Sequence, residues 1–113
     1  MPNIEANTPI VTQINVFTVP DGGQQALIDF LVESATFAST TPGWLSASVH
    51  RSIDGTRVVN YAQSESLEAA QRIVERLRTE GWLDRNKALG EAHPGLYEVV
   101  FAVDRSVPGA AGD

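Results

Sequence analysis

The order of strand-like and helix-like segments limits the fold of this chain more than any other property of its sequence. A β-branched run over Ile10 to Val19 predicts a strand, and Pro20-Asp-Gly-Gly23 ends it. Apolar residues then recur at helical spacing through about Ser39, with Asp21 as the expected N-cap. The breaker Thr41-Pro-Gly43 separates this helix from the next strand-like run. The chain is therefore expected to begin with a strand and a helix.

The rest of the chain continues with two strands, a helix and a final strand. The three further strands are predicted over Trp44–Ile53, Arg57–Gln63 and Leu96–Val103. Asp54-Gly55 is a hairpin turn signal between the first two of them. A helix capped by Ser64 or Ser66 is expected to end at Gly81. A short helical piece follows, and His93-Pro-Gly95 is expected to separate it from the last strand.

This β-α-β-β-α-β order is that of the α+β ferredoxin-like fold, with an antiparallel sheet covered by helices. We expect the first and third strands to lie side by side and parallel in the centre of the sheet, with the other two at its edges. One domain is predicted over residues 10–104, with flexible tails at 1–9 and 105–113.

The strands are apolar on both faces, although a single helical layer covers only one face of a sheet. In the first strand, Ile14 and Val16 alternate with Val11, Phe17 and Val19. The last strand shows the same two-sided pattern. We therefore expect a second copy to pack sheet against sheet, which gives a homodimer with the form of a dimeric α+β barrel.

The charge and residue content exclude several classes of function. The chain of 113 residues carries a net charge of −6 and contains no cysteine, and its pI is near 4.7. An acidic protein is poorly suited to nucleic acid or anionic membrane surfaces. No apolar run reaches the roughly 18 residues of a membrane-spanning helix. We expect a cytoplasmic protein with no nucleic-acid or membrane partner, and no ligand set for a metal or motif for a cofactor is recognisable.

Two asparagines in the middle of strands are the sharpest candidates for chemistry. Asn15 and Asn60 are expected on adjacent central strands, where asparagine has poor strand propensity. Two such amides could hold a developing oxyanion in a substrate, as oxyanion-hole donors do. They could equally form a structural pair bonded to each other or to the backbone. Both interpretations stay open at this point.

Histidine offers a proton-transfer group near neutral pH. His50 shares a strand face with Ser46 and Ser48, so it is a candidate general acid or base on a polar face, or a surface residue of an edge strand. His93 lies beside Pro94 in an expected loop and is more simply incidental.

Aromatic residues and one arginine could form a pocket for a flat ligand, or simply part of the core and surface. The substrate-binding candidates from this group are Trp44, Phe30, Phe37, Trp82 and Arg85.

Three segments of the chain resemble the antibiotic biosynthesis monooxygenase family. They are Ile14-Asn-Val-Phe-Thr-Val19, Thr41-Pro-Gly-Trp-Leu-Ser-Ala-Ser-Val-His50 and Asp54-Gly-Thr-Arg-Val-Val-Asn-Tyr-Ala-Gln-Ser-Glu-Ser66. The resemblance covers nearly all of residues 10–104 and is strongest to the cofactor-independent anthrone oxygenases of aromatic polyketide pathways. It implies a ferredoxin-like homodimer that oxidises a small aromatic substrate with O₂.

The resemblance also assigns residues. It implies that Asn15 and Asn60 match family active-site asparagines and that His50 matches a pocket histidine, and it offers Arg85 as a pocket arginine. The chain departs from the family at Ser64, where the family usually has tryptophan. It departs again at Ala70, which stands where some members carry tyrosine. Ser64 is therefore a substrate-site position with an unusual residue.

Three functions remain in view. The first is a cofactor-independent monooxygenase that forms a quinone through a substrate carbanion held by the asparagines. The second is a non-oxidative polyketide cyclase or isomerase of the same fold, which the loss of the tryptophan favours. The third is a non-catalytic dimeric protein that binds a small molecule.

Overall fold

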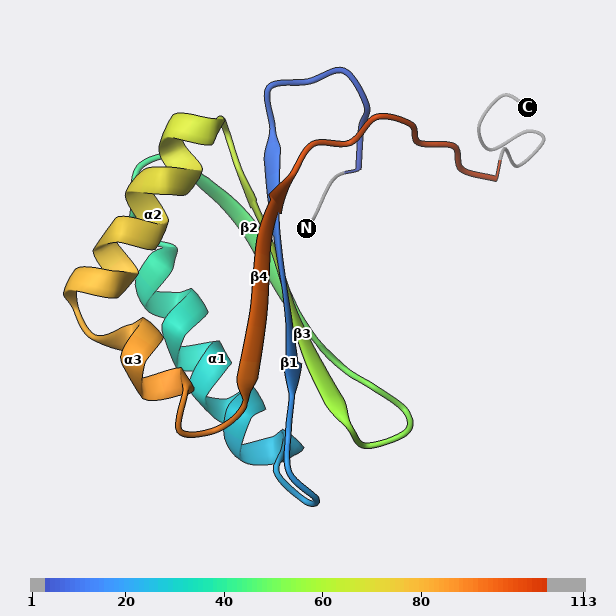
Figure 1. The fold of residues 1–113 in the computed structure, drawn as a ribbon. Helices are drawn as coiled ribbons and strands as arrows, with labels where there is room; N and C mark the ends of the chain where they lie inside the picture. The colour runs from blue at the N-terminus through green and yellow to red at the C-terminus, as the bar shows by residue number, and fades with distance from the viewer. Residues whose placement is uncertain (1–3, 106–113) are drawn as a thin grey trace.

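A four-stranded sheet with three helices on one side makes up the part of the chain that is described. The computed structural model describes residues 4–105. The elements are β1 (Val11–Thr18), α1 (Gln24–Ala38), β2 (Trp44–Arg51), β3 (Arg57–Ser64), α2 (Leu67–Thr79), α3 (Trp82–Asn86) and β4 (Glu91–Tyr97). The strand order is β2-β3-β1-β4, and all three helices cover the same face of the sheet (Figure 1). The predicted α+β ferredoxin-like fold is confirmed.

The two central strands are antiparallel, so the expectation that they run parallel was wrong. Asn15 of β1 lies opposite Asn60 of β3 in an antiparallel register. The reason is the path of the chain. The crossover through α1 makes β2 run in the same direction as β1, and the hairpin after β2 makes β3 run in the opposite direction. Every neighbouring pair in the sheet is consequently antiparallel.

The last strand begins earlier than expected and includes the predicted breaker. β4 covers Glu91–Tyr97, so His93, Pro94 and Gly95 lie inside it and not before it. An edge strand tolerates proline because only one side of its backbone takes part in the ladder. The predicted strand over Leu96–Val103 therefore lay about five residues too far toward the C-terminus and overlaps β4 only at Leu96 and Tyr97.

The helices α1 and α2 begin in different ways. Ser66 caps α2 as predicted, since its hydroxyl accepts a 3.1 Å hydrogen bond from the Ala69 N–H. Asp21 does not cap α1, in contrast to the expectation, because the helix starts later with Gly23 at the N-cap and no capping side chain. Gln24 instead turns toward the β2–β3 hairpin, donating to the carbonyls of Ser52 and Arg57 at 3.0 and 2.9 Å.

The predicted hairpin turn at Asp54-Gly55 is present. Gly55 has φ 86°, a left-handed conformation that glycine adopts without strain. The Asp54 carboxylate accepts hydrogen bonds from the Thr56 hydroxyl, the Thr56 N–H and the Ser52 hydroxyl. These bonds favour the ionised form and lower the pKa of Asp54 from 3.8 to about 2.

The core lies between the sheet and the helices in two parts. Beneath α1, the buried side chains are Phe17, Leu27, Leu31 and Val58. Between α1 and α2, the second part is built from Ala38, Ile73 and Leu77, with Trp44 and Trp82 packed against it. Each such side chain contributes roughly 1.5–3 kcal/mol when it is large and fully buried. The helical face of the sheet is thus the packed one.

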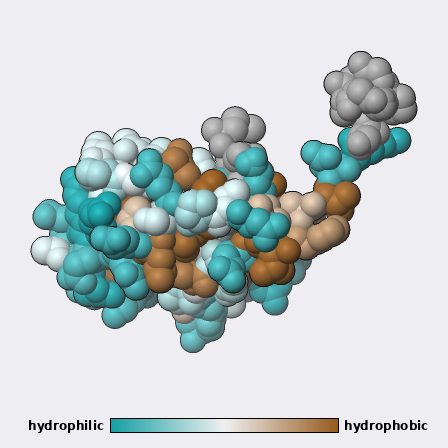
Figure 2. Space-filling view, turned by 90° about the horizontal axis from the view of Figure 1, so that it is seen from above, coloured by the Kyte–Doolittle hydropathy of each residue, from teal (hydrophilic) through white to brown (hydrophobic). Residues whose placement is uncertain are grey.

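The segment after β4 leaves the body of the protein. Val100, Phe101 and Val103 are 80%, 75% and 79% exposed, and the chain runs away from the sheet here (Figure 1). Apolar surface continues onto this extension (Figure 2). We refer to residues 99–103 as the apolar arm. Of the predicted tails, residues 1–3 and 106–113 lie outside the described residues.

No helix in residues 4–105 is both long and apolar enough to cross a membrane.

Candidate functional site

The alternation of side chains along the strands divides the candidate residues between two faces of the sheet. Phe17 and Val58 belong to the core, so Asn15 and Asn60, which share their alternation, also face the helices. His50 lies opposite Val59 and therefore points to the uncovered face. Within one chain, the predicted catalytic residues therefore lie on opposite faces of the sheet, with the two asparagines on one face and His50 on the other.

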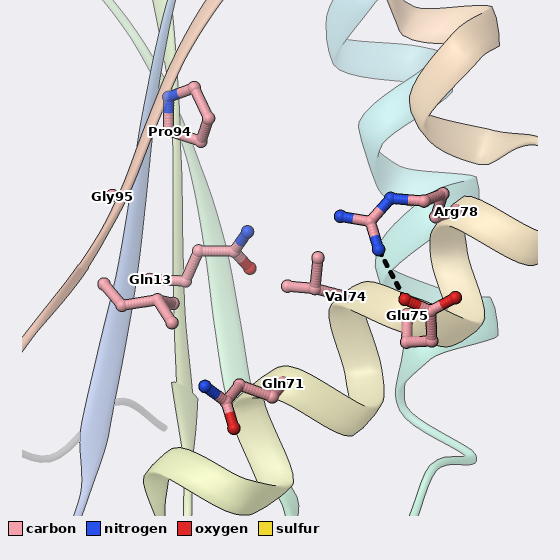
Figure 3. Close-up of a pocket in the computed structure, with 8 residues that line it drawn as sticks. Gln13, Gln71, Val74, Glu75, Arg78, Pro94 and Gly95 are labelled. Carbon is pink, nitrogen blue, oxygen red and sulfur yellow. Dashed lines mark hydrogen bonds and ion pairs between the residues drawn. The ribbon is translucent and has the colours of Figure 1, made fainter.

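A cavity opens on the helical side between α2 and the strands β1 and β4. Its volume is about 410 Å³, which falls in the range of small-molecule sites. Gln13 extends from β1 toward α2, and Pro94 and Gly95 form the β4 wall (Figure 3). The opposite wall is α2, with Gln71, Val74, Glu75 and Arg78. We call this space the outer cavity.

A much smaller chamber lies beside it, deeper under the helices. It has about 20 Å³ of space for the centre of a water molecule. Four polar side chains line it: Gln13, Ser34, Asn60 and Ser64. Its other walls are Trp44 and small or aliphatic side chains, namely Ala35, Ala38, Ala47, Ala62, Ala70, Ile73 and Leu77. We call it the inner chamber; Gln13 lines both spaces.

The two asparagines are direct cross-strand neighbours, as the sequence predicted, but their hydrogen bonding differs. Asn15 is buried, and its Oδ1 accepts a 3.1 Å hydrogen bond from the His93 N–H of β4. Asn60 Oδ1 is also buried, yet it has no hydrogen-bond partner among the described residues. An unpaired buried polar atom costs about 1–3 kcal/mol. The side chain of Asn15 is thus part of the hydrogen bonding of the fold, whereas Asn60 Oδ1 can still accept a hydrogen bond.

The predicted aromatic residues do not form one pocket. Phe30 and Phe37 each lie 5.4 Å from the Trp82 ring between the helices. Arg85 stacks over Trp82 at 4.2 Å from its centroid. Trp44 is the member of this set that lines the inner chamber, together with Ser64. The aromatic cluster therefore belongs to the helical packing, outside both cavities.

The two histidines share the uncovered face of the sheet. His50 Nε2 lies 2.8 Å from the Ser48 hydroxyl, in agreement with the predicted polar strand face. His93, expected in a loop, is on β4 and lies 3.9 Å from the Glu91 carboxylate. Neither side chain reaches the cavities on the other side of the sheet.

The outer cavity is lined by residues that sequence reasoning did not select. Gln71, Glu75 and Arg78 have the appearance of a solvated helix face, and the Glu75–Arg78 ion pair is largely exposed. Gln13 carried a detectable signal, since it is a polar residue in the middle of a β-branched run. In residues 4–105, no three carboxylate or histidine side chains group in a way that could hold a metal ion.

Comparison with known proteins gives a monooxygenase as a relative in sequence. The chain is 30% identical over 112 residues to the tetracenomycin-F1 monooxygenase of Streptomyces glaucescens, which covers 98% of this chain and 100% of that protein. No family model matches the chain.

Solved structures agree with this relationship. The monooxygenase from the gene ActVA-Orf6 of Streptomyces coelicolor, in complex with nanaomycin D, has a TM-score of 0.74 at 27% identity and covers 85% of this chain and 92% of that one. SnoaB from Streptomyces nogalater, described as a cofactor-independent oxygenase, shares the fold with a TM-score of 0.70 at 22% identity over 89% of this chain and 99% of that one. Since the sequence relative spans the whole domain, the chain belongs to the antibiotic biosynthesis monooxygenase family.

Proposed function

We propose that this protein is a cofactor-independent monooxygenase that oxidises an aromatic polyketide-like substrate, such as an anthrone or hydroquinone, to a quinone. The observation that carries the proposal is the placement of the Asn60 side chain, which has no hydrogen bond to its Oδ1 from the described residues, beside a cavity of ligand size. The names of the relatives support an oxygenase. The dimensions of the outer cavity suit a compact polycyclic molecule.

The reaction balances without any redox cofactor. An anthrone loses a proton from its methylene carbon, and the resulting carbanion transfers electrons to O₂. A carbon–oxygen bond forms to give a peroxide, and loss of water from this peroxide leaves the quinone. One oxygen atom of O₂ enters the product, and the other leaves as water together with the two methylene hydrogens. The protein needs only to hold the substrate and stabilise the enolate oxygen.

Asn60 is proposed to hold that oxygen through its Nδ2–H, because a fixed amide donor interacts strongly with the charge that develops there. Asn15 supports this arrangement from the neighbouring position, with its carbonyl engaged by β4. His50 of the same chain faces the opposite side of the sheet. Proton transfer in the cavity is therefore assigned to solvent entering through the mouth and not to His50.

Oxygen uptake tests the proposal. Purified protein given anthrone is expected to consume O₂ and release anthraquinone, and Asn60→Ala is expected to lower kcat/KM by about 10²-fold, the scale of losing one oxyanion donor. His50→Ala, on the other sheet face, is the matched control and should change the rate little. Absence of O₂ uptake with anthrone and hydroquinone substrates would contradict the proposal.

One observation keeps a second function in view. Ser64 lines the inner chamber where the resemblance expects tryptophan, and both asparagines are retained. A cyclase or isomerase would use these amides without O₂. Product formation under strict anaerobiosis would identify that activity, and tight ligand binding without turnover would identify a binding protein.

We also propose that the protein forms a homodimer through the uncovered sheet face and the apolar arm. The support is the exposure of Val100, Phe101 and Val103 on a segment that has strand-like composition. A second copy is the simplest cover for a surface that every chain of this protein would carry.

A further inference from the structure

The inner chamber contains an unmet hydrogen-bonding requirement. Asn60 lines the chamber, and its Oδ1 is buried without a partner in residues 4–105. Three other polar side chains line the same space: Gln13, Ser34 and Ser64. A small polar space with an unsatisfied group is the setting in which proteins hold a polar guest.

The size of the chamber limits that guest to one oxygen-sized group. A water molecule fills roughly 10–15 Å³, and the chamber leaves about 20 Å³ in which the centre of such a molecule can lie. The chemistry limits it further, because a carbonyl oxygen needs a hydrogen-bond donor. Dioxygen is small enough but cannot donate. A hydroxyl both donates and accepts, so it can pair with the Asn60 side chain whether Oδ1 or Nδ2 faces the chamber.

We propose that the inner chamber is a subsite for a single hydroxyl group that donates a hydrogen bond to Asn60 Oδ1. In the free protein the hydroxyl is that of a water molecule. In the complex it is a phenolic hydroxyl of an aromatic ligand that lies in the outer cavity and reaches past Gln13. The second half rests on the proposed function, because that function places an aromatic ligand in the outer cavity.

The small residues around Asn60 make this subsite possible. Ser64 and Ala70 face the chamber from β3 and α2, and both are nearly buried, at 6% and 4% exposure. Larger side chains at either position would occupy the space. The substrates that fit best are therefore aromatic molecules with a free hydroxyl at the end that enters first.

Two measurements test the subsite without turnover. A crystal structure of the free protein is expected to show one ordered water within hydrogen-bond distance of Asn60 Oδ1. Binding is then compared under nitrogen for 2-naphthol and 2-methoxynaphthalene, which differ in the ability to donate. We expect 2-naphthol to bind about 5–10-fold more tightly, the value of one hydrogen bond. Asn60→Leu should remove the difference.

Two further variants complete the test. Ala70→Val narrows the chamber from α2 and leaves Asn60 in place, so it should also remove the preference for 2-naphthol. Ser48→Ala, on the uncovered sheet face, is the control and should keep it. An ordered water with equal binding of both ligands would assign the hydroxyl to water alone. A chamber without water and equal binding, or a preference that survives Asn60→Leu, would overturn the proposal. Since neither ligand needs to react, this outcome is independent of oxygen uptake.

Discussion

At the scale of single residues, the Asn15–Asn60 pair shows how one residue type serves two purposes at neighbouring positions. Asn15 lies opposite Pro94, which has no N–H, and its side-chain oxygen accepts a hydrogen bond from the N–H of the preceding residue, His93. It therefore fastens the edge strand where the backbone ladder is interrupted. Asn60 is on β3, which lies between β1 and β2 in the sheet, so its side chain does not hold an edge strand in place. Its amide is free to serve the cavity.

This difference predicts that the same substitution costs more stability at Asn15 than at Asn60. Asn15→Ala leaves the His93 N–H without its partner and is expected to lower the free energy of unfolding by about 1–3 kcal/mol. Asn60→Ala removes no hydrogen bond within the described chain and should cost less than about 1 kcal/mol. Urea unfolding measures both. A larger loss for Asn60→Ala would show that its amide has a structural partner after all.

Asp54 predicts a pH dependence of the hairpin. Its pKa in the folded protein is about 2, below the ordinary 3.8, so its ionised form favours the folded state. This contribution is fully present above about pH 4 and is lost as the pH falls through about 2. A carboxyl titration by NMR should give the lowered pKa. Asp54→Asn should show a shallower loss of stability in this interval, and an identical acid profile would contradict the assignment.

At the scale of elements, periodicity and breakers predicted β1, β2, β3 and the helices closely, because each has an uninterrupted apolar pattern. The error at β4 has a physical cause. Thr12 pairs with Tyr97 near the first residue of β1, so the residues after Tyr97 have no strand left to pair with in this chain. Their high strand propensity alone could not reveal that. Polar cavity residues on α2 were missed because a cavity wall and a solvated face have the same composition.

The loop before β2 gives a prediction at this scale. Gly43 has φ 93°, and a Cβ there would lie 2.4 Å from the Ala69 Cβ of α2. Gly55 has a similar φ of 86° but no atom within 4 Å of such a Cβ. Gly43→Ala should therefore destabilise the protein by about 1–3 kcal/mol more than Gly55→Ala, the usual cost of overpacking. Equal thermal shifts would mean that the loop can move away from α2.

At the scale of the whole molecule, the apolar arm is the surface least compatible with an isolated chain. Soluble monomers seldom expose contiguous apolar segments of this kind. In the proposed homodimer the arm lies against the second copy, which also covers the uncovered sheet face. That arrangement would leave both cavities on the helical side of each chain, away from the interface.

Removal of the arm tests this arrangement. A chain ending at Glu98 is expected to sediment as a monomer, because it lacks the exposed apolar side chains of residues 99–103. A chain ending at Arg105, which keeps the arm, is the control and should remain a dimer. A dimer formed by both chains would place the interface on the sheet face alone, and a monomeric full-length protein would refute the homodimer.

The outer cavity separates α2 from β4, although α2 packs against the other three strands. One wall of the site is therefore an edge strand that does not pack against α2. A ligand that extends along this wall displaces no helix packing, so breadth should be tolerated more readily than a change at the end that meets Asn60. Such an enzyme would accept substrates of different widths and would discriminate among the groups at the end that enters first.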